Sequence, residues 1–270
     1  MKTRSIDEEL NVSNFGDPRY ETGRGVLFND DCGDILSNME DEKFDLVFLD
    51  PPFNLQKNYG EEFSDDLKPD EYKKWCKNWL SECVRILNEG GSLFLYHLPE
   101  KLLWFGNQLN ELNLDFRHWI AIDYKSTYPS KNKLYPAHYG LLYYTKGDPN
   151  YFNRPKIPIE ECRHCGGDIK DYGGYRKNIV ENGGINLSDV WTDLSPVRHE
   201  STRNRDANEL PEKMLERILK ISTKEADLIL DPFAGAGTSA VVAERMDRFW
   251  LSVEIGDCEP FIDRLEGELR

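Results

Sequence analysis

Four consecutive residues, Asp50-Pro51-Pro52-Phe53, place hydrogen-bond acceptors beside an aromatic ring directly after the apolar run 44–49. Proline has no N–H to donate and a nearly fixed φ, so a double proline makes a stiff loop whose carbonyl oxygens face outward as acceptors. The Asp50 carboxylate adds a second acceptor, and Phe53 adds a flat apolar face. This combination suits an exocyclic amine on a planar heterocycle, which stacks while both of its N–H bonds are accepted. The alternative is a strand-ending turn with an aspartate cap and a core aromatic.

A second motif occupies residues 227–244, where the pattern predicts a buried strand, a glycine loop and a helix. Gly235 and Gly237 let the backbone approach a ligand closely, and the start of the helix presents free N–H groups. Glu254 ends the strand that follows, where a carboxylate can accept hydrogen bonds from both hydroxyls of a ribose. The string Gly235-x-Gly237-x-x-Ala240 also satisfies a loose NAD fingerprint, so an NAD-linked oxidoreductase is an alternative. That class of enzyme has no use for the motif at 50–53.

The elements that position these motifs alternate regularly between strand and helix after a polar segment, residues 1–22, that we expect to be a tail or loose arm. The predicted strands are 26–29, 44–49, 92–96, 116–123 and 139–144, and the predicted helices are 32–39, 69–88 and 100–111. The long helix begins at Pro69, buries an aromatic face and ends before Gly90-Gly91. The strands 116–123 and 139–144 are expected to pair in antiparallel fashion.

Together the motifs resemble those of the β-class amino-group DNA methyltransferases. Asp50-Pro-Pro-Phe53 is similar to the catalytic [DNS]-P-P-[YFW] motif of that family, and Asp231-Pro-Phe-Ala-Gly-Ala-Gly237-Thr238 is similar to its cofactor loop. The chain order, with the catalytic motif first and the cofactor loop last, is the permuted order of that class. The resemblance covers most of residues 25–145 and 186–256.

The resemblance implies a fold, a cofactor and roles for particular residues. The fold would be an α/β, Rossmann-like methyltransferase fold with a seven-stranded, mostly parallel sheet and an antiparallel edge strand. The catalytic domain would comprise 23–124 and 206–270 with the strand 139–144, and a target-recognition insert would span 125–205. S-adenosyl-L-methionine would be the methyl donor. The residues implied in binding it are Asp31, Asp50, Asp231, Phe233, Gly235, Ala236, Gly237, Thr238 and Glu254.

The implied activity is methyl transfer to an exocyclic amine of double-stranded DNA. The flipped base would stack on Phe53 and donate its amino hydrogens to the Asp50 carboxylate and the Pro51 carbonyl, with Pro52 stiffening the loop. Asp as the first residue of the motif favours adenine N6, and cytosine N4 is the alternative. An RNA or protein amine methyltransferase and a non-catalytic DNA-binding subunit are further alternatives. By resemblance, a homodimer and a cognate restriction enzyme are possible partners.

Charge is unevenly distributed along the chain. The net charge is −15 and the isoelectric point is about 4.9, which opposes DNA binding at long range. Between Arg117 and Arg205, however, 14 Lys and Arg face 10 Asp and Glu, a local excess of +4. Aromatic residues and amines alternate there, as on nucleic-acid surfaces and in ordinary loops. We expect DNA contacts in this insert, including Tyr172, Tyr175 and Arg176, and an affinity that falls with salt.

The remaining features place the protein in a broad class. At 270 residues the chain can form one α/β domain with a smaller addition, and it has no membrane-spanning stretch and no signal peptide, so we expect it in the cytoplasm. Its six scattered cysteines are expected to be reduced. Cys162-Arg-His-Cys165 has the spacing of half a zinc site, but no second such pair is present, so we expect no metal. Lys213 is either a contact to the cofactor carboxylate or a solvated helix lysine.

Overall fold

The fold is built on one large sheet. A computed structural model describes residues 12–55, 66–123, 137–158, 173–194 and 209–269, together with residues 6, 10, 131, 132 and 134. The strands of the large sheet are β1 (Tyr20–Glu21), β2 (Gly25–Phe28), β3 (Phe44–Leu49), β4 (Leu87–His97), β5 (Asp115–Asp123), β6 (His138–Thr145), β9 (Val190–Trp191), β10 (Leu228–Asp231) and β11 (Phe249–Val253). In this part of the chain they form nine strands in the order β1-β2-β11-β10-β3-β4-β6-β5-β9.

The central strands confirm the predicted fold class. β2, β11, β10, β3 and β4 are parallel neighbours, while β6 runs antiparallel between β4 and β5. The predicted antiparallel pairing of β5 with β6 is therefore confirmed. The two-residue strands β1 and β9 extend the predicted seven strands to nine, and β1 is an edge strand that runs antiparallel to β2.

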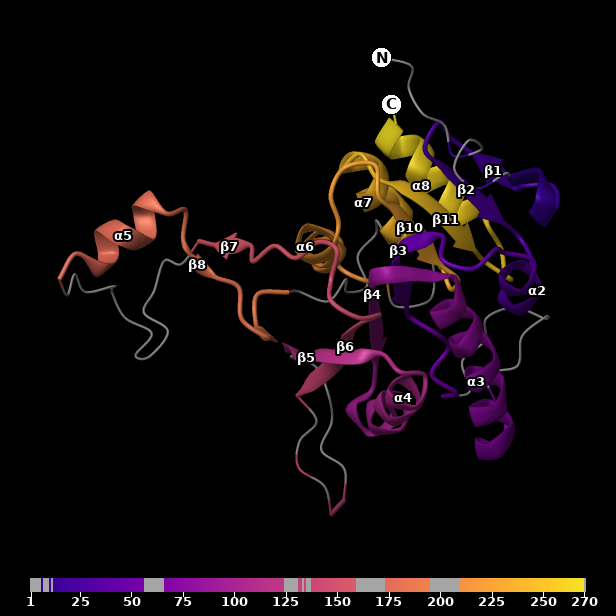
Figure 1. Ribbon diagram of the computed structural model, residues 1–270, viewed down its shortest axis with the longest axis horizontal. Helices are drawn as coiled ribbons and strands as arrows, with labels where there is room; N and C mark the ends of the chain where they lie inside the picture. Colours follow the sequence, from indigo (N-terminus) through magenta and orange to yellow (C-terminus); the bar gives the residue numbers. More distant parts are fainter. Residues whose placement is uncertain are drawn as a thin grey trace.

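Helices cover both faces of the sheet (Figure 1). On one face lie α2 (Cys32–Ser37), α3 (Pro69–Ile86) and α4 (Pro99–Glu111), and on the other lie α6 (Glu212–Ser222), α7 (Thr238–Arg245) and α8 (Glu259–Leu269). Successive strand residues alternate between the two cores: in β3, Val47 packs with the first set of helices and Leu46 with the second. Strands buried on both faces explain the nearly continuous apolar runs in the sequence.

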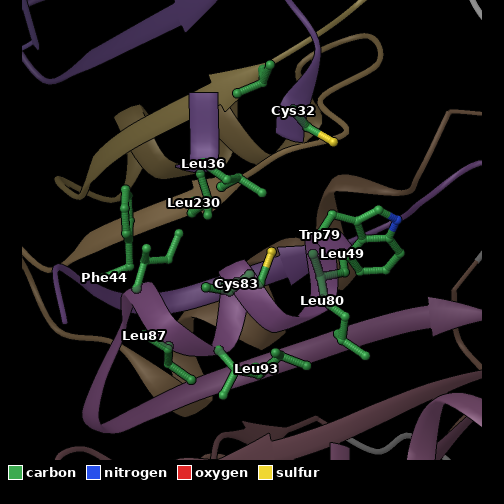
Figure 2. Close-up of a cluster of buried hydrophobic side chains, with 14 of the residues drawn as sticks. Cys32, Leu36, Phe44, Leu49, Trp79, Leu80, Cys83, Leu87, Leu93 and Leu230 are labelled. Carbon is green, nitrogen blue, oxygen red and sulfur yellow. The ribbon is translucent and has the colours of Figure 1, made fainter. Parts of the chain in front are cut away.

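The first core is centred on α3, as its aromatic face predicts. Figure 2 shows Trp79, Leu80 and Cys83 from α3 packed against Leu49 of β3 and Leu93 of β4. All five side chains are at most 2% exposed. Cys32, Cys76, Cys83 and Cys258 are free thiols and buried, in agreement with the expected reduced state for the described cysteines.

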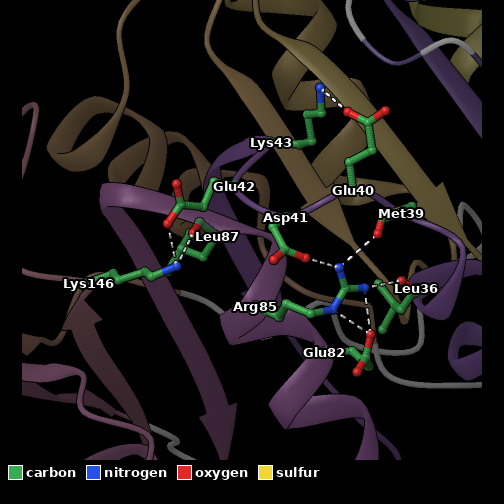
Figure 3. Close-up of polar contacts among 10 residues, drawn as sticks. All are labelled: Leu36, Met39, Glu40, Asp41, Glu42, Lys43, Glu82, Arg85, Leu87 and Lys146. Carbon is green, nitrogen blue, oxygen red and sulfur yellow. Dashed lines mark hydrogen bonds and ion pairs between the residues drawn. The ribbon is translucent and has the colours of Figure 1, made fainter.

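Two basic side chains fasten the segment that leads into β3 (Figure 3). Arg85, in the last turn of α3, donates to the backbone oxygen of Leu36 (2.9 Å) in the last turn of α2 and to that of Met39 (2.8 Å) just after α2. A cation at the carbonyl end of a helix satisfies acceptors that the helix leaves free. Lys146 donates to Leu87 O at 2.9 Å and pairs with Glu42. The start of β3 is thus held on both sides.

The predicted end of the long helix differs from the structure. α3 ends at Ile86 and β4 begins at Leu87, so Gly90 and Gly91 lie within a strand and do not end the helix. Gly90 has a φ of +76°, and an added Cβ would lie 2.4 Å from the Asn150 side chain, so the glycine permits a close approach at this point.

The segment 1–22 is not a loose arm in its described part. Ile6, Leu10 and Val12 are at most 6% exposed and belong to the first core, and η1 (Val12–Phe15) packs Phe15 edge-on against Phe28. The segment is polar and aperiodic overall, but these four apolar side chains pack into the first core.

The predicted insert 125–205 returns to the main sheet twice, at β6 and at β9. The remainder of its described part contains α5 (Tyr175–Glu181) and a separate two-stranded sheet of β7 (Lys156–Ile157) and β8 (Ile185–Asn186), which extends away from the main sheet (Figure 1). In the described residues no helix is both long and apolar enough to cross a membrane.

Candidate active site

Polar residues gather where the parallel strands end. β3 pairs with β10 so that Leu230 lies opposite Val47, and β11 pairs with β2 so that Val253 lies opposite Phe28. Because the carboxyl ends of parallel strands meet at one edge, Asp50, Asp231 and Glu254 are brought to that edge from distant parts of the chain.

A cleft opens at this edge between the two sequence motifs. It encloses about 420 Å³, a volume that includes space open to solvent. Its lining residues are Phe48, Asp50, Glu209, Leu210, Asp231, Phe233, Ala234, Gly235, Ala236, Thr238 and Ser239. The predicted catalytic aspartate and most of the predicted cofactor loop therefore face the same cavity.

The Asp231 carboxylate organises the start of the glycine loop. One of its oxygens accepts from the backbone N–H of Phe233 at 3.0 Å, and the other accepts from the Ser239 hydroxyl. The side chain is almost completely buried, and the loss of hydration raises the pKa of Asp231 to about 6, although both hydrogen bonds oppose that rise. The carboxylate therefore ties the strand end to the first turn of α7.

Glu254 closes the glycine loop from the neighbouring strand. Its carboxylate accepts from Gly235 N at 2.7 Å and from Gly256 N at 2.9 Å. Gly235 and Gly237 have φ values of +54° and +77°, a region that favours glycine, and a Cβ at Gly237 would lie 2.7 Å from the Phe261 ring. The loop conformation thus depends on both glycines and on the carboxylate that receives one of their N–H groups.

Asp31 lies near Glu254 at the same edge of the sheet. It is the N-cap of α2, where its carboxylate accepts from Gly33 N at 2.7 Å. The adjacent Asn29 donates to the backbone oxygens of Glu254 and Gly256 and so joins the two strand ends. The structure gives Asp31 a capping role that its spacing in the sequence did not predict.

The loop of residues 50–53 is held by two residues outside the motif. Tyr72 of α3 donates its hydroxyl to Pro52 O at 2.7 Å and also contacts His97 Nε2 at 3.2 Å. The half-buried Phe53 ring stacks on the His97 ring, with centroids 4.0 Å apart and an interplanar angle of 22°. Tyr96 and Tyr139 lie beside Phe53 in tilted orientations, at 6.1 and 6.2 Å.

Lys213 contacts an aspartate of the protein itself. Its Nζ lies 2.6 Å from Asp193 Oδ2, and the same oxygen accepts from Arg217 at 2.5 Å. The hydrogen bond from Arg217, followed by that from Lys213, holds the pKa of Asp193 well below its usual range. Lys213 is exposed on α6, which agrees with the second of the two interpretations, a solvated helix lysine.

Several residues in the cleft or beside the catalytic loop were not anticipated from the sequence. Glu209 pairs with Arg264, which also donates to the Thr238 hydroxyl at 2.9 Å. No spacing in the sequence indicated this pairing between α8 and the segment that precedes α6. His97, by contrast, follows a predicted strand directly, and a polar residue at that position was a usable signal. Cys162, Cys165 and Tyr172 lie outside the described residues, Tyr175 begins α5, and Arg176 on α5 is exposed.

Comparison with known proteins identifies relatives over most of the chain. The family model N6_N4_Mtase, described as DNA methylase, matches residues 44–259. M.BamHI, a type II methyltransferase of Bacillus amyloliquefaciens, is 47% identical over 252 residues, which are 93% of this chain and 59% of M.BamHI. M.HpaI of Haemophilus parainfluenzae, also a type II methyltransferase, is 29% identical over 86% of this chain and 71% of its own length. The chain thus spans somewhat more than half of M.BamHI.

Solved structures share the fold. The cytosine-N4-specific PvuII DNA methyltransferase superimposes with a TM-score of 0.63 at 21% identity, covering 95% of this chain and 90% of its own. The complex of M1.HpyAVI with S-adenosylmethionine superimposes with a TM-score of 0.59 at 16% identity, covering 91% of this chain and 99% of its own. At these identities the likeness establishes the arrangement of helices and strands.

Proposed function

Because the chain belongs to the N6_N4_Mtase family of DNA methylases, we propose that it transfers a methyl group from S-adenosylmethionine to an exocyclic amine of a base in DNA. One observation carries the proposal: Asp50 and the glycine loop after Asp231, about 180 residues apart in sequence, line one cleft. An acceptor for an amine and a loop for a nucleotide-like cofactor are thereby brought within reach of one another.

The cofactor loop fits S-adenosylmethionine in its donor set and backbone conformation. Glu254 offers carboxylate oxygens at the strand end, and each such oxygen has a second lone pair beyond the one used by a backbone N–H. These oxygens would accept the ribose hydroxyls. Thr238, whose oxygen already accepts from Arg264, retains its own proton to donate toward the cofactor carboxylate. Asp31, Phe233 and Ala236 complete the proposed binding residues.

The catalytic loop prepares the amine. When bound, S-adenosylmethionine supplies an electrophilic methyl group on a sulfonium. The Asp50 carboxylate and the Pro51 carbonyl accept the two amine hydrogens, which localises the nitrogen lone pair that aromatic conjugation otherwise withdraws. Phe53 holds the ring of the flipped base by stacking. Methyl transfer would form the N–C bond as the S–C bond breaks and would leave S-adenosylhomocysteine, while the proton that the amine loses would pass to the Asp50 carboxylate; no covalent bond to the protein is required.

Adenine N6 is the first candidate for the methylated atom. The motif at 50–53 resembles the [DNS]-P-P-[YFW] motif of the family, and aspartate as its first residue favours adenine. Cytosine N4 is the second candidate. It is supported by the fold shared with the cytosine-N4-specific PvuII methyltransferase. Both amines present the same geometry to Asp50 and Pro51, so the catalytic loop alone does not distinguish the two bases.

Double-stranded DNA is the proposed partner, and the insert 125–205 is the proposed element that reads its sequence. In the described part of the insert, α5 with β7 and β8 stands away from the sheet, and Arg176 on α5 is exposed. Such a projection can reach the flanking base pairs while the target base enters the cleft. A homodimer and a cognate restriction enzyme remain proposals that follow from the family resemblance.

The test is a transfer assay with labelled S-adenosylmethionine and duplex DNA, followed by mass spectrometry of the digested nucleosides. We expect N6-methyladenine, and N4-methylcytosine would overturn the choice of base. An absence of label in DNA, or label found only in an RNA competitor, would overturn the function. Asp50→Ala should abolish transfer and leave the affinity for S-adenosylhomocysteine largely intact, because it removes the acceptor for the reacting amine while the glycine loop and Glu254 remain in place.

A further inference from the structure

The His97 side chain lies directly behind the catalytic loop, and its hydrogen bonds determine its tautomer. It is 0% exposed at the end of β4, and its Nδ1 accepts from the backbone N–H of Leu98 at 2.8 Å. Burial, with a smaller effect of Lys101, lowers the pKa of His97 to about 3, so the ring is neutral near pH 7. A neutral imidazole whose Nδ1 is an acceptor carries its proton on Nε2.

That tautomer defines the direction of a hydrogen-bond chain to the catalytic loop. His97 Nε2–H donates to the Tyr72 oxygen across 3.2 Å, and the Tyr72 hydroxyl donates to Pro52 O across 2.7 Å. Each group in the chain thus donates in one direction and accepts from the other, an arrangement in which the bonds polarise one another. The Pro52 carbonyl thus accepts from Tyr72, and the Pro51 carbonyl is the one proposed to accept from the target amine.

The same imidazole covers one face of the aromatic ring that is proposed to hold the base. Phe53 stacks on His97 with centroids 4.0 Å apart, a separation typical of rings in direct contact. Only the opposite face of Phe53 is then accessible to a planar ligand. Tyr96 and Tyr139, stacked on each other at 5.2 Å, also lie beside the Phe53 ring.

We infer that His97 is a positioning residue for methyl transfer: with Tyr72 it fixes Pro52 and turns one defined face of Phe53 toward the target base. The inference rests on the proposed function, since it assumes that the amine is bound by the loop 50–53. It concerns the rate of transfer and leaves the cofactor loop untouched, because His97 and Tyr72 do not line the cleft around the glycine loop.

The decisive experiment is a double-mutant cycle between Tyr72→Phe and His97→Phe. Tyr72→Phe removes the hydroxyl that links the two residues, and His97→Phe keeps an aromatic face behind Phe53 but removes the Nε2 donor. Loss of one hydrogen bond should lower kcat by about two- to tenfold. Because both changes break one chain, we expect the double variant to be no slower than the slower single variant. The affinity for S-adenosylhomocysteine should stay within about twofold.

Tyr144→Phe is the matched control. Tyr144 is 2% exposed and donates to a backbone oxygen, that of Gly106 in α4, at 3.3 Å, so its change deletes the same kind of bond away from the loop. It should lower the melting temperature without lowering kcat. His97→Gln, whose amide nitrogen can still donate to Tyr72, should recover part of the rate lost in His97→Phe. Multiplicative effects in the cycle, or an equal loss of kcat in the control, would overturn the inference.

A spectroscopic measurement separates this inference from the proposed function. Nitrogen NMR of the histidine-labelled protein should show His97 as the Nε2–H tautomer, with an Nε2 shift that changes in Tyr72→Phe. The Nδ1–H tautomer would overturn the role of His97 whether or not the protein methylates DNA. If His97 shows the expected tautomer but the protein does not methylate DNA, the proposed function is overturned, and so is the effect of His97 on the rate of transfer.

Discussion

Glu254→Gln tests the link between the strand end and the cofactor loop. The carboxylate uses one oxygen for Gly235 N and the other for Gly256 N. A glutamine of the same size has only one acceptor oxygen, so one of the two backbone N–H groups would face an NH₂ donor. An unsatisfied donor costs about 1–3 kcal/mol, which for a chain of this size corresponds to a decrease in melting temperature of roughly 2–10 °C.

The same substitution should weaken cofactor binding by a separate amount. In the proposed function the carboxylate accepts ribose hydroxyls, and a hydrogen bond to a charged acceptor contributes about 1.5–3 kcal/mol. Losing one such bond raises the dissociation constant about 10- to 150-fold. Isothermal titration calorimetry with S-adenosylhomocysteine measures this constant, at a temperature where the variant is fully folded.

Asp227→Asn is the control for Glu254→Gln. Asp227 is 8% exposed and accepts from the backbone N–H of Lys224 at 2.9 Å, but it precedes β10 at the opposite end of the strand. It should change the melting temperature and not the dissociation constant. If Glu254→Gln lowers the melting temperature while its dissociation constant stays within about twofold of the wild type, Glu254 does not contact the cofactor and the reasoning is refuted.

Three further predictions concern stability. The pKa of Asp231 is raised from 3.8 to about 6, so its contribution to stability is present below about pH 4 and is lost as the pH rises through 6. The melting temperature of Asp231→Asn should therefore rise relative to that of the wild type between about pH 4 and 6, and a constant difference would contradict this. Gly237→Ala, at a φ of +77°, should lower the free energy of unfolding by about 1–3 kcal/mol in urea titrations, while Gly267→Ala in α8, with open space around it, should not. Asp193→Ala leaves the 5% exposed Arg217 without its ion pair, and because Asp193 is half-exposed we expect the free energy of unfolding in urea to fall by about 1–3 kcal/mol. Adding Arg217→Met should restore part of this stability, and no recovery would refute the ion-pair explanation.

The strands and helices of the sheet were predictable because burial on both faces gives long apolar runs. The strand 44–49 was predicted to the residue, and α3 was recognised from Pro69 and its aromatic face. The N-terminal segment was not, since its apolar residues join the first core, with Phe15 against Phe28 of β2, and have no periodicity of their own. The end of α3 was misplaced because Gly90 serves a close approach to Asn150, a contact between residues sixty apart.

The candidate site was predictable only where its chemistry resides in local motifs. Asp50, Asp231 and the glycines were found because the types and order of residues around them are distinctive. Tyr72 and His97 support the loop through contacts between α3, β4 and residues 52–53, and these depend on packing that no local pattern encodes. The pairing of Lys213 with Asp193 across β9 and α6 is of the same kind.

The strand order has a consequence for synthesis on the ribosome. β2 and β3 lie on either side of β11 and β10, which come from residues 228–253. Until that segment is made, each of the early strands has an unpaired edge facing the gap between them. With about 180 residues to be added after β3 at roughly 5–20 residues per second, the nascent chain exposes these edges for roughly 10–40 s. The arrival of β10 and β11 ends this aggregation-prone interval and assembles the cleft in the same step.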